Sequence, residues 1–322
     1  MSHPPFDRIL VTGGTGFIGR YVVNMLVRDG FRPLVTALAR RAFENNEYLH
    51  EVDIVNLDLT DSTKTNELIE SYRPHGVVHL AGATGHNDAT GEICHAVNFI
   101  GTVNLLKALE RCSVRRVIIL GSASEYGKQI LPFREDMTAR PVSHYGISKA
   151  KSTEAALEMN AATGFPVTIL RVFSAFGYGQ PAKMFLSQLI NHALINQHFK
   201  MSDGLQKRDY VYAGEVAAAI KASLSTENAI GRIINIASGR GTVLKELAET
   251  VWDVCGADRS LLEIGSIEKT GDDGFDTEAD ISLADRILGW RPLNSILPTE
   301  GKNFALPEMI RQMKSRAHLV RR

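Results

Sequence analysis

Tyr145 and Lys149 are the two side chains in this 322-residue chain whose spacing points most directly to chemistry. They stand four residues apart in HYGISKA, at the start of an expected helix, so both point from one face. A tyrosine with its ordinary pKa of about 10 is a poor acid or base at neutral pH, but an adjacent ammonium favours its phenolate form. Of the eight tyrosines only Tyr145 has a lysine four residues later, which favours a proton-transfer pair over a chance spacing.

Ser122 is the candidate for a second hydrogen-bond partner of the reacting oxygen, which such chemistry requires. It ends the apolar strand in VIILGSAS, and ligands meet a parallel sheet at strand ends. Glu125 follows three residues later. Two interpretations of it stay open: part of the motif of the site, or a charge on the surface.

A glycine-rich turn follows the first expected strand in TGGTGFIGR, with glycines at 13, 14, 16 and 19. Glycine is needed where the turn is tight, where backbone approaches a pyrophosphate and where helix packs on strand; the helix N-terminus then binds the negative charge. Because the pattern lies between a strand and a helix, it predicts dinucleotide binding rather than a plain connecting turn.

The choice of dinucleotide depends on the end of the second expected strand, PLVTALARR. An acid there usually binds the ribose 2′-hydroxyl of NAD, but this chain has Ala37, followed by Arg40 and Arg41. An arginine pair matches the 2′-phosphate of NADP(H), which we favour, with NAD(H) possible and two solvated arginines as the alternative. Asp58 is a candidate for the adenine amino group, and its neighbours Thr60 and Asp61 are candidates for a helix N-cap.

The elements that must position these residues alternate between short β-branched runs and helix-length amphipathic stretches. This rhythm predicts an α/β fold with a doubly wound parallel sheet of Rossmann type. The expected strands are 8–12, 33–38, 52–57, 76–81, 114–120, 165–172 and 231–237, and the expected helices are 17–30, 62–73, 92–112 and 146–163.

After residue 173 the regular alternation of strands and helices ends. Glycine and proline residues follow, and then helical segments with few strands between them. We expect residues 1–173 to form the NAD(P)-binding domain, with 211–237 returning to it. Residues 174–210 and 238–322 should form a smaller substrate-binding cap.

Composition excludes several classes of protein. Lys plus Arg equals Asp plus Glu at 36 each, so no strong field would attract nucleic acid or an anionic membrane. The start of the chain has no signal-peptide pattern and no apolar run reaches membrane-span length, so we expect a cytoplasmic protein. Three scattered cysteines, Cys94, Cys112 and Cys255, predict neither a disulfide scaffold nor a metal site.

Several motifs together, TGGTGFIG, VVHLAG, NFIGTVNLLKAL, GSASEYG, YGISK and RDYVY, resemble those of the extended short-chain dehydrogenase/reductases that act on nucleotide sugars. The resemblance covers nearly the whole chain. It implies a catalytic set of Ser122, Tyr145 and Lys149, a nucleotide sugar under the C-terminal cap, a structural role for Asn98 and a homodimer paired through 92–112 and 146–163. The cofactor contacts that we expect are Gly13, Gly16, Phe17, Ile18, Gly19, Arg40, Arg41, Asp58, Leu59, Leu80, Ala81 and Lys149.

The member of the family is predicted from the residues before Tyr126. The family's 4,6-dehydratases carry carboxylates where this chain has Ala123 and Ser124, so the groups that remove water are missing. The motif GSxxEYG at residues 121–127 is most similar to that of reductases of nucleotide-linked 4-keto-6-deoxyhexoses, of the kind that makes GDP-rhamnose. A 4-epimerase with tightly held NAD is the alternative. A non-catalytic NADP sensor is a second alternative, disfavoured by the Tyr–Lys pair.

Substrate contacts are expected from Ser124, Tyr145, Ser174, Arg208 and His86. Ser174 stands where the family usually has asparagine, which departs from its pattern. Arg208 falls on the arginine that contacts the diphosphate in relatives, with an ion pair to Asp209 as the alternative. His86 lies in the loop after the fourth strand, where contact with sugar and plain solvation both remain open.

Overall fold

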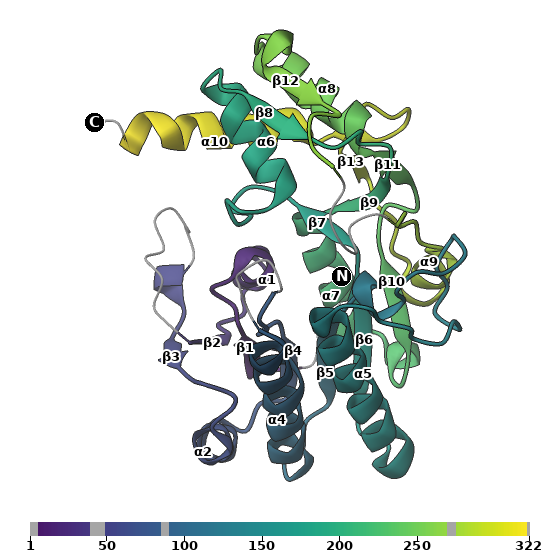
Figure 1. Cartoon of the computed structure of the whole chain (residues 1–322). Helices are drawn as coiled ribbons and strands as arrows, with labels where there is room; N and C mark the ends of the chain where they lie inside the picture. Colours follow the sequence, from purple (N-terminus) through teal and green to yellow (C-terminus); the bar gives the residue numbers. More distant parts are fainter. Residues whose placement is uncertain (1–5, 39–48, 85–89, 269–274, 321–322) are drawn as a thin grey trace.

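A computed structural model describes residues 6–38, 49–84, 90–268 and 275–320, with side chains through residue 315 (Figure 1). Arg40, Arg41 and His86, which the sequence places in the cofactor and substrate sites, lie outside the described residues.

Within the described ranges, seven parallel strands form the central sheet, in the order β10-β6-β5-β4-β1-β2-β3. All seven overlap the strands expected from sequence, so the predicted doubly wound sheet is confirmed. β1 pairs with β2 on one side and with β4 on the other. The order in which strands are added to the sheet therefore reverses between β1 and β4. The strands are β1 (Ile9–Thr12), β2 (Leu34–Ala37), β3 (Ile54–Asn56), β4 (Gly76–His79), β5 (Arg116–Ser122), β6 (Val167–Val172) and β10 (Ile233–Ile236).

Helices cover both faces of this sheet (Figure 1). One face packs against α1 (Phe17–Arg28), α7 (Ala213–Ser225) and α9 (Ser282–Leu288). The other packs against α2 (Ser62–Tyr72), α4 (Gly101–Glu110) and α5 (His144–Thr163). The α9 helix lies in the range expected for the cap, yet Ala284 is buried in the core of the sheet.

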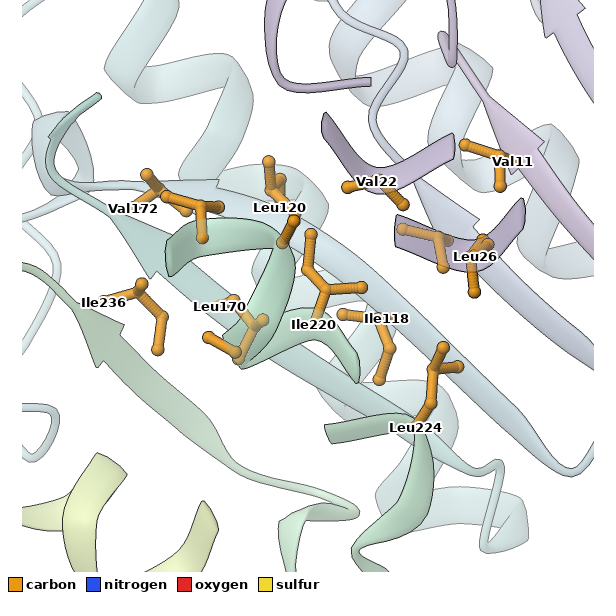
Figure 2. Close-up of a cluster of buried hydrophobic side chains, with 14 of the residues drawn as sticks. Val11, Val22, Leu26, Ile118, Leu120, Leu170, Val172, Ile220, Leu224 and Ile236 are labelled. Atoms are coloured by element: carbon orange, nitrogen blue, oxygen red, sulfur yellow. The ribbon is translucent and has the colours of Figure 1, made fainter. Parts of the chain in front are cut away.

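Strand residues alternate between these two cores, as the two-residue period of a strand requires. On β5, Ile118 and Leu120 point into the core with α1 and α7, which Figure 2 shows, whereas Val117 and Ile119 point into the core with α4 and α5. Burial on both faces explains why these strands are continuously apolar.

The helix expected over 92–112 is interrupted. It consists of α3 (Gly91–Cys94), a π-helical turn (His95–Ile100) and then α4. A π turn widens a helix by one residue and often marks a functional site.

The C-terminal half contains more strands than its sequence predicts, because each is short and lacks a long apolar run. A second core joins α6 (Phe185–Leu194), α8 (Leu244–Cys255) and α10 (Leu306–Val320) around Trp252. The remaining elements are β7 (Ser174–Phe176), β8 (Phe199–Met201), β9 (Lys207–Tyr212), β11 (Gly241–Val243), β12 (Leu262–Ile264), β13 (Asn294–Ser295), β14 (Asn303–Phe304) and the 3-10 turns Leu49–Glu51, Ala123–Glu125, Glu227–Ala229 and Arg259–Leu261. None of the described helices is long and apolar enough to cross a membrane.

Candidate active site

The glycine-rich turn between β1 and α1 has no room for side chains at two positions. Gly13 has a φ of +66°, and a Cβ added there would lie 2.6 Å from the Ala81 backbone nitrogen. A Cβ on Gly19 would lie 2.5 Å from the Gly13 carbonyl oxygen. Gly16 is the N-cap of α1 and makes no side-chain cap bond, so the first N–H groups of the helix have no capping side chain. This turn fits a pyrophosphate.

The end of β4 lies against this turn, as expected for Leu80 and Ala81. The Leu80 N–H donates to the Thr12 carbonyl at 3.0 Å, and Ala81 is the residue that a Gly13 side chain would strike. The turn therefore lies between the carboxyl ends of β1 and β4, where the sheet reverses its order and where open α/β sheets bind ligands.

At the adenosine end, Ala37 closes β2 and is buried, so no carboxylate occupies the usual ribose-binding position. The Asp58 carboxylate accepts bonds from the Thr60 N–H at 2.9 Å and the Thr60 hydroxyl at 2.7 Å. Asp61 caps α2, as expected for a neighbour of Asp58, by accepting from the Lys64 N–H. Leu59 is buried against Gly101 at the start of α4.

Ser122, Tyr145 and Lys149 come together where β5 ends and α5 begins. Ser143 caps α5 by accepting from the Gly146 N–H at 3.1 Å. A Cβ on Gly146 would lie 2.5 Å from the Ser124 carbonyl oxygen, so the first turn of α5 packs directly on the turn after Ser122. The Ser122 side chain lies close enough to Tyr145 to lower the pKa of its hydroxyl.

Burial controls the acid–base properties of this group. Burial raises the pKa of Tyr145 to about 12, and the neighbouring Ser122 side chain opposes the rise. Burial also lowers the pKa of Lys149, against the attraction of the Glu125 carboxylate. The phenol is therefore protonated at neutral pH until another positive charge approaches, which stabilises the phenolate.

Asn98 lies in the π turn and ties the site together. Its amide oxygen accepts from the Ala83 N–H at 2.7 Å, and its amide nitrogen donates to Ser148 on α5 at 2.9 Å. Its carbonyl oxygen accepts from Ser152 at 2.7 Å. The widened turn thus joins the loop after β4 to the helix that carries Tyr145.

His79, which the sequence reasoning did not single out, is buried at the end of β4. Its ring nitrogens bond Thr12 at 2.6 Å and Thr102 at 2.8 Å. Burial and the nearby Lys149 ammonium lower its pKa to about 3, so the ring is neutral. The polar residue inside the apolar run VVHLA was the signal that could have identified it.

Glu125 is fully buried, so its interpretation as a surface charge is wrong. Its carboxylate accepts from the Ser122 N–H at 2.7 Å and forms an ion pair with Arg171 on β6 at 2.9 Å. A carboxylate survives such burial only when paired and hydrogen-bonded, and both conditions hold here.

The expected substrate contacts are more dispersed. Ser124 is half-buried in the turn that follows β5, and Ser174 is half-buried at the start of β7. Arg208, on β9, donates to the Phe275 carbonyl at 2.5 Å. Asp209, the alternative partner proposed for it, is buried and accepts from the Ser238 and Gly239 N–H groups. Burial raises the pKa of Asp209 to about 6.

Taken by its residues alone, this site fits a nicotinamide dinucleotide. The glycine turn leaves space that any side chain would fill, and the α1 N-terminus has no capping side chain. A half-buried tyrosine, a buried lysine and a buried serine meet at the end of β5, on the same edge of the sheet. Such an arrangement can transfer a proton to or from an oxygen-bearing carbon whose hydride is exchanged with a nicotinamide.

Three comparisons agree with this geometry. The chain is 28% identical over 337 residues to a dTDP-L-rhamnose 4-epimerase of Burkholderia thailandensis, covering 88% of this chain and 90% of that protein. Its fold matches a UDP-glucose 4-epimerase of Thermotoga maritima solved with UDP-glucose, at a TM-score of 0.88, 24% identity, and 96% and 99% coverage of the two chains.

It also matches MoeE5, solved in complex with UDP-glucose and NAD, at a TM-score of 0.83 and 25% identity over 96% of this chain and 99% of that one. A family model described as "NAD dependent epimerase/dehydratase family" matches residues 9–237. The chain is therefore a member of the NAD-dependent epimerase/dehydratase family, a group of nicotinamide-dependent enzymes that act on nucleotide sugars.

Proposed function

We propose that this enzyme is a 4-epimerase of a nucleoside-diphosphate hexose. The observation that carries the proposal is the convergence of Ser122, Tyr145 and Lys149 at the end of β5, on the same edge of the sheet as the glycine-rich turn. The similarity to a 4-epimerase over most of both chains supports epimerisation in particular. The same convergence disfavours a sensor without chemistry, because a sensor needs no proton-transfer pair.

Each residue has a defined task in the proposed reaction. A nicotinamide dinucleotide held at the glycine-rich turn would supply reversible hydride exchange with the sugar C4. Tyr145 takes the proton from the C4 hydroxyl and later gives it back, and Ser122 binds the oxygen throughout. Lys149 supplies the positive charge that favours the phenolate.

Reduction of a 4-keto sugar, the main prediction from the sequence, uses the same three residues. That prediction depended on the form GS, two residues, EYG, in which Glu125 is the distinguishing acid. Since Glu125 is buried under Ser122 rather than open to substrate, it serves reduction and epimerisation equally and does not favour the reductase.

The proposal is tested by incubating the purified enzyme with UDP-, dTDP-, GDP- and CDP-hexoses without added reductant. We expect one of them to be converted into its C4 epimer, detected by chromatography. In parallel, NADPH oxidation is measured with the corresponding 4-keto sugars. Stoichiometric NADPH use with no epimer from any hexose would establish the reductase instead.

Cofactor choice is a separate prediction. Ala37 removes the carboxylate that would bind a ribose 2′-hydroxyl, which supports NADP(H), whereas MoeE5 was solved with NAD. If Arg40 and Arg41 bind the 2′-phosphate, changing both to alanine should weaken NADPH binding by about tenfold or more and leave NADH binding unchanged. Equal losses for both cofactors, measured by fluorescence titration, would contradict this role.

We also propose a homodimer paired through the helices 91–110 and α5. Ile93, Ile100 and Ile147 are exposed on these elements, which suits an apolar contact between two copies. Sedimentation at micromolar concentration should give about twice the 35.4 kDa chain mass. Ile100→Lys with Ile147→Lys should yield monomers, and a monomeric unsubstituted protein would contradict the proposal.

The remaining assignments extend the same proposal. Residues 174–210 and 238–322, apart from α9, contribute the substrate cap, with Arg208 as the ligand of the diphosphate and Ser124 and Ser174 beside the sugar. The cytoplasmic location expected from the sequence belongs to this proposal too.

A further inference from the structure

The Glu125 carboxylate lies beneath the site and receives three hydrogen bonds from three different elements. Its Oε1 accepts from the backbone N–H of Ser122 at 2.7 Å. Its Oε2 accepts from the Thr153 hydroxyl on α5 at 2.9 Å and from the Arg171 Nε on β6 at 2.9 Å. Ser122 and α5, which carries the other two active-site residues, are thus joined through one side chain.

The surrounding sequence is built around this carboxylate. A Cβ on Gly121 would lie 2.6 Å from the Glu125 Oε1, so only glycine leaves room for it. The Arg171 guanidinium stacks on the Tyr126 ring at 4.5 Å, and the Tyr126 hydroxyl donates to Asn235 on β10 at 2.6 Å. These contacts explain why Gly121, Glu125 and Tyr126 occur together in GSASEYG.

We propose that Glu125 is the positioning residue of this site, fixing Ser122 against α5 so that Ser122 and Tyr145 address the same substrate oxygen. The proposal rests on the function proposed above. Glu125 itself is buried under the turn and acts only through Ser122 and α5.

The carboxylate also has an electrostatic effect. Its negative charge adds to the effect of burial in raising the pKa of Tyr145, and it opposes the effect of burial that lowers the pKa of Lys149. The groups next to Glu125 are Arg171 on β6 and Tyr126 in the same turn, while Cys94 lies near Tyr145 and His79 near Lys149. Further out, Glu135 interacts with Arg171 and Tyr126, and Asp280 interacts with Glu135.

Glu125→Gln tests the role with little change of shape. A glutamine has one acceptor oxygen, so the Ser122 N–H and the Arg171 Nε–H can no longer both be satisfied. We expect kcat to fall by about tenfold or more, with a much smaller change in KM. Because the negative charge that raises the pKa of Tyr145 is lost, the midpoint of the acid limb of the kcat/KM profile should move to lower pH.

Glu135→Gln is the matched control. Glu135 is a half-buried carboxylate that accepts from the Asn235 N–H at 2.9 Å and interacts with Arg171, but it has no bond to Ser122 or α5. It should lower thermal stability and leave kcat and the pH midpoint unchanged. If Glu125→Gln behaves like this control, losing stability alone, the positioning role is refuted.

Thr153→Val is a second variant, useful if Glu125→Gln does not fold. It removes the tie to α5 and keeps the charge, the Arg171 pair and the bond to Ser122. We expect kcat to fall several-fold at constant cofactor affinity with an unmoved pH midpoint. Unchanged kcat would show that the hydrogen bond from Thr153 to Glu125 does not position the site.

A measurement without substrate separates failure of this proposal from failure of the proposed function. The phenolate of Tyr145 is titrated by ultraviolet difference absorbance in cofactor-bound protein, with Tyr145→Phe as the blank. A lower midpoint in Glu125→Gln supports the coupling even if every tested sugar is inert, and an identical midpoint contradicts it.

Discussion

Replacing Tyr145 with phenylalanine is expected to lower kcat by about a thousandfold while cofactor affinity stays unchanged. The substitution removes one hydroxyl group and keeps the ring, and proton transfer by a positioned side chain contributes about 10²–10⁴-fold in rate. The Tyr145 hydroxyl lies near the Ser122 side chain, which is the partner proposed for the same substrate oxygen. Rates are measured with the hexose found active in the substrate panel.

Tyr72→Phe is the matched control for this loss. It also removes a tyrosine hydroxyl, one that donates to the Ile9 carbonyl at 3.2 Å, at the amino end of β1 and so at the opposite end of the sheet from the site. This control should keep the full rate. A Tyr145→Phe enzyme retaining more than about a tenth of the activity, a barrier change of only ~1.4 kcal/mol, would show that another group transfers the proton.

Gly19→Ala is expected to weaken nicotinamide dinucleotide binding by about ten- to a hundredfold. The new Cβ would lie 2.5 Å from the Gly13 carbonyl oxygen and 2.5 Å from the Gly14 carbonyl carbon. Both are backbone atoms, so the clash can be relieved only by moving the turn or the start of α1. An overpacked site of this kind costs about 1–3 kcal/mol, and each 1.4 kcal/mol is about a tenfold change in affinity.

Gly256→Ala separates this effect from general destabilisation. Gly256 ends α8 with a φ of +68° and has open space around its Cβ position, so the change strains the backbone far from the turn. It should lower the melting temperature without altering cofactor affinity, as measured by calorimetric titration. Normal affinity in Gly19→Ala would mean that the dinucleotide does not use this turn.

The sheet and its central site could be predicted from the sequence because their signals are local. A strand such as β5 is a continuous apolar run, and the glycine spacing after β1 has a steric cause within a few residues. The Tyr145–Lys149 pair needs only one helical turn. Ser122 needs only the end of a strand, and the structure brings all three together.

Residues that depend on distant partners could not be predicted in the same way. The burial of Glu125 requires Arg171, which is 46 residues later in the chain, and the residues near position 125 do not indicate that pairing. His79 likewise acquires its role from Thr102. The π turn at Asn98 and the short strands of the cap depend on packing, which leaves no regular apolar pattern in the sequence.

The reaction itself was underdetermined by the motif. Ser122, Tyr145 and Lys149 handle the same proton and the same oxygen whether the enzyme reduces a ketone or epimerises an alcohol. What distinguishes the two reactions is whether the hydride returns to the same sugar. That depends on how the cap lets the sugar turn and on how firmly the cofactor is retained.

The most direct test of the proposed function therefore follows the hydrogen at C4. The enzyme is incubated, without added cofactor, with the active hexose carrying deuterium at C4, and the products are examined by NMR and mass spectrometry. We predict a mixture of the two C4 epimers, both of which keep deuterium at C4. In a parallel incubation with added NADH or NADPH, we predict no net consumption of either cofactor. Absence of any epimer, together with one equivalent of NADPH consumed per 4-keto sugar reduced, would contradict the account.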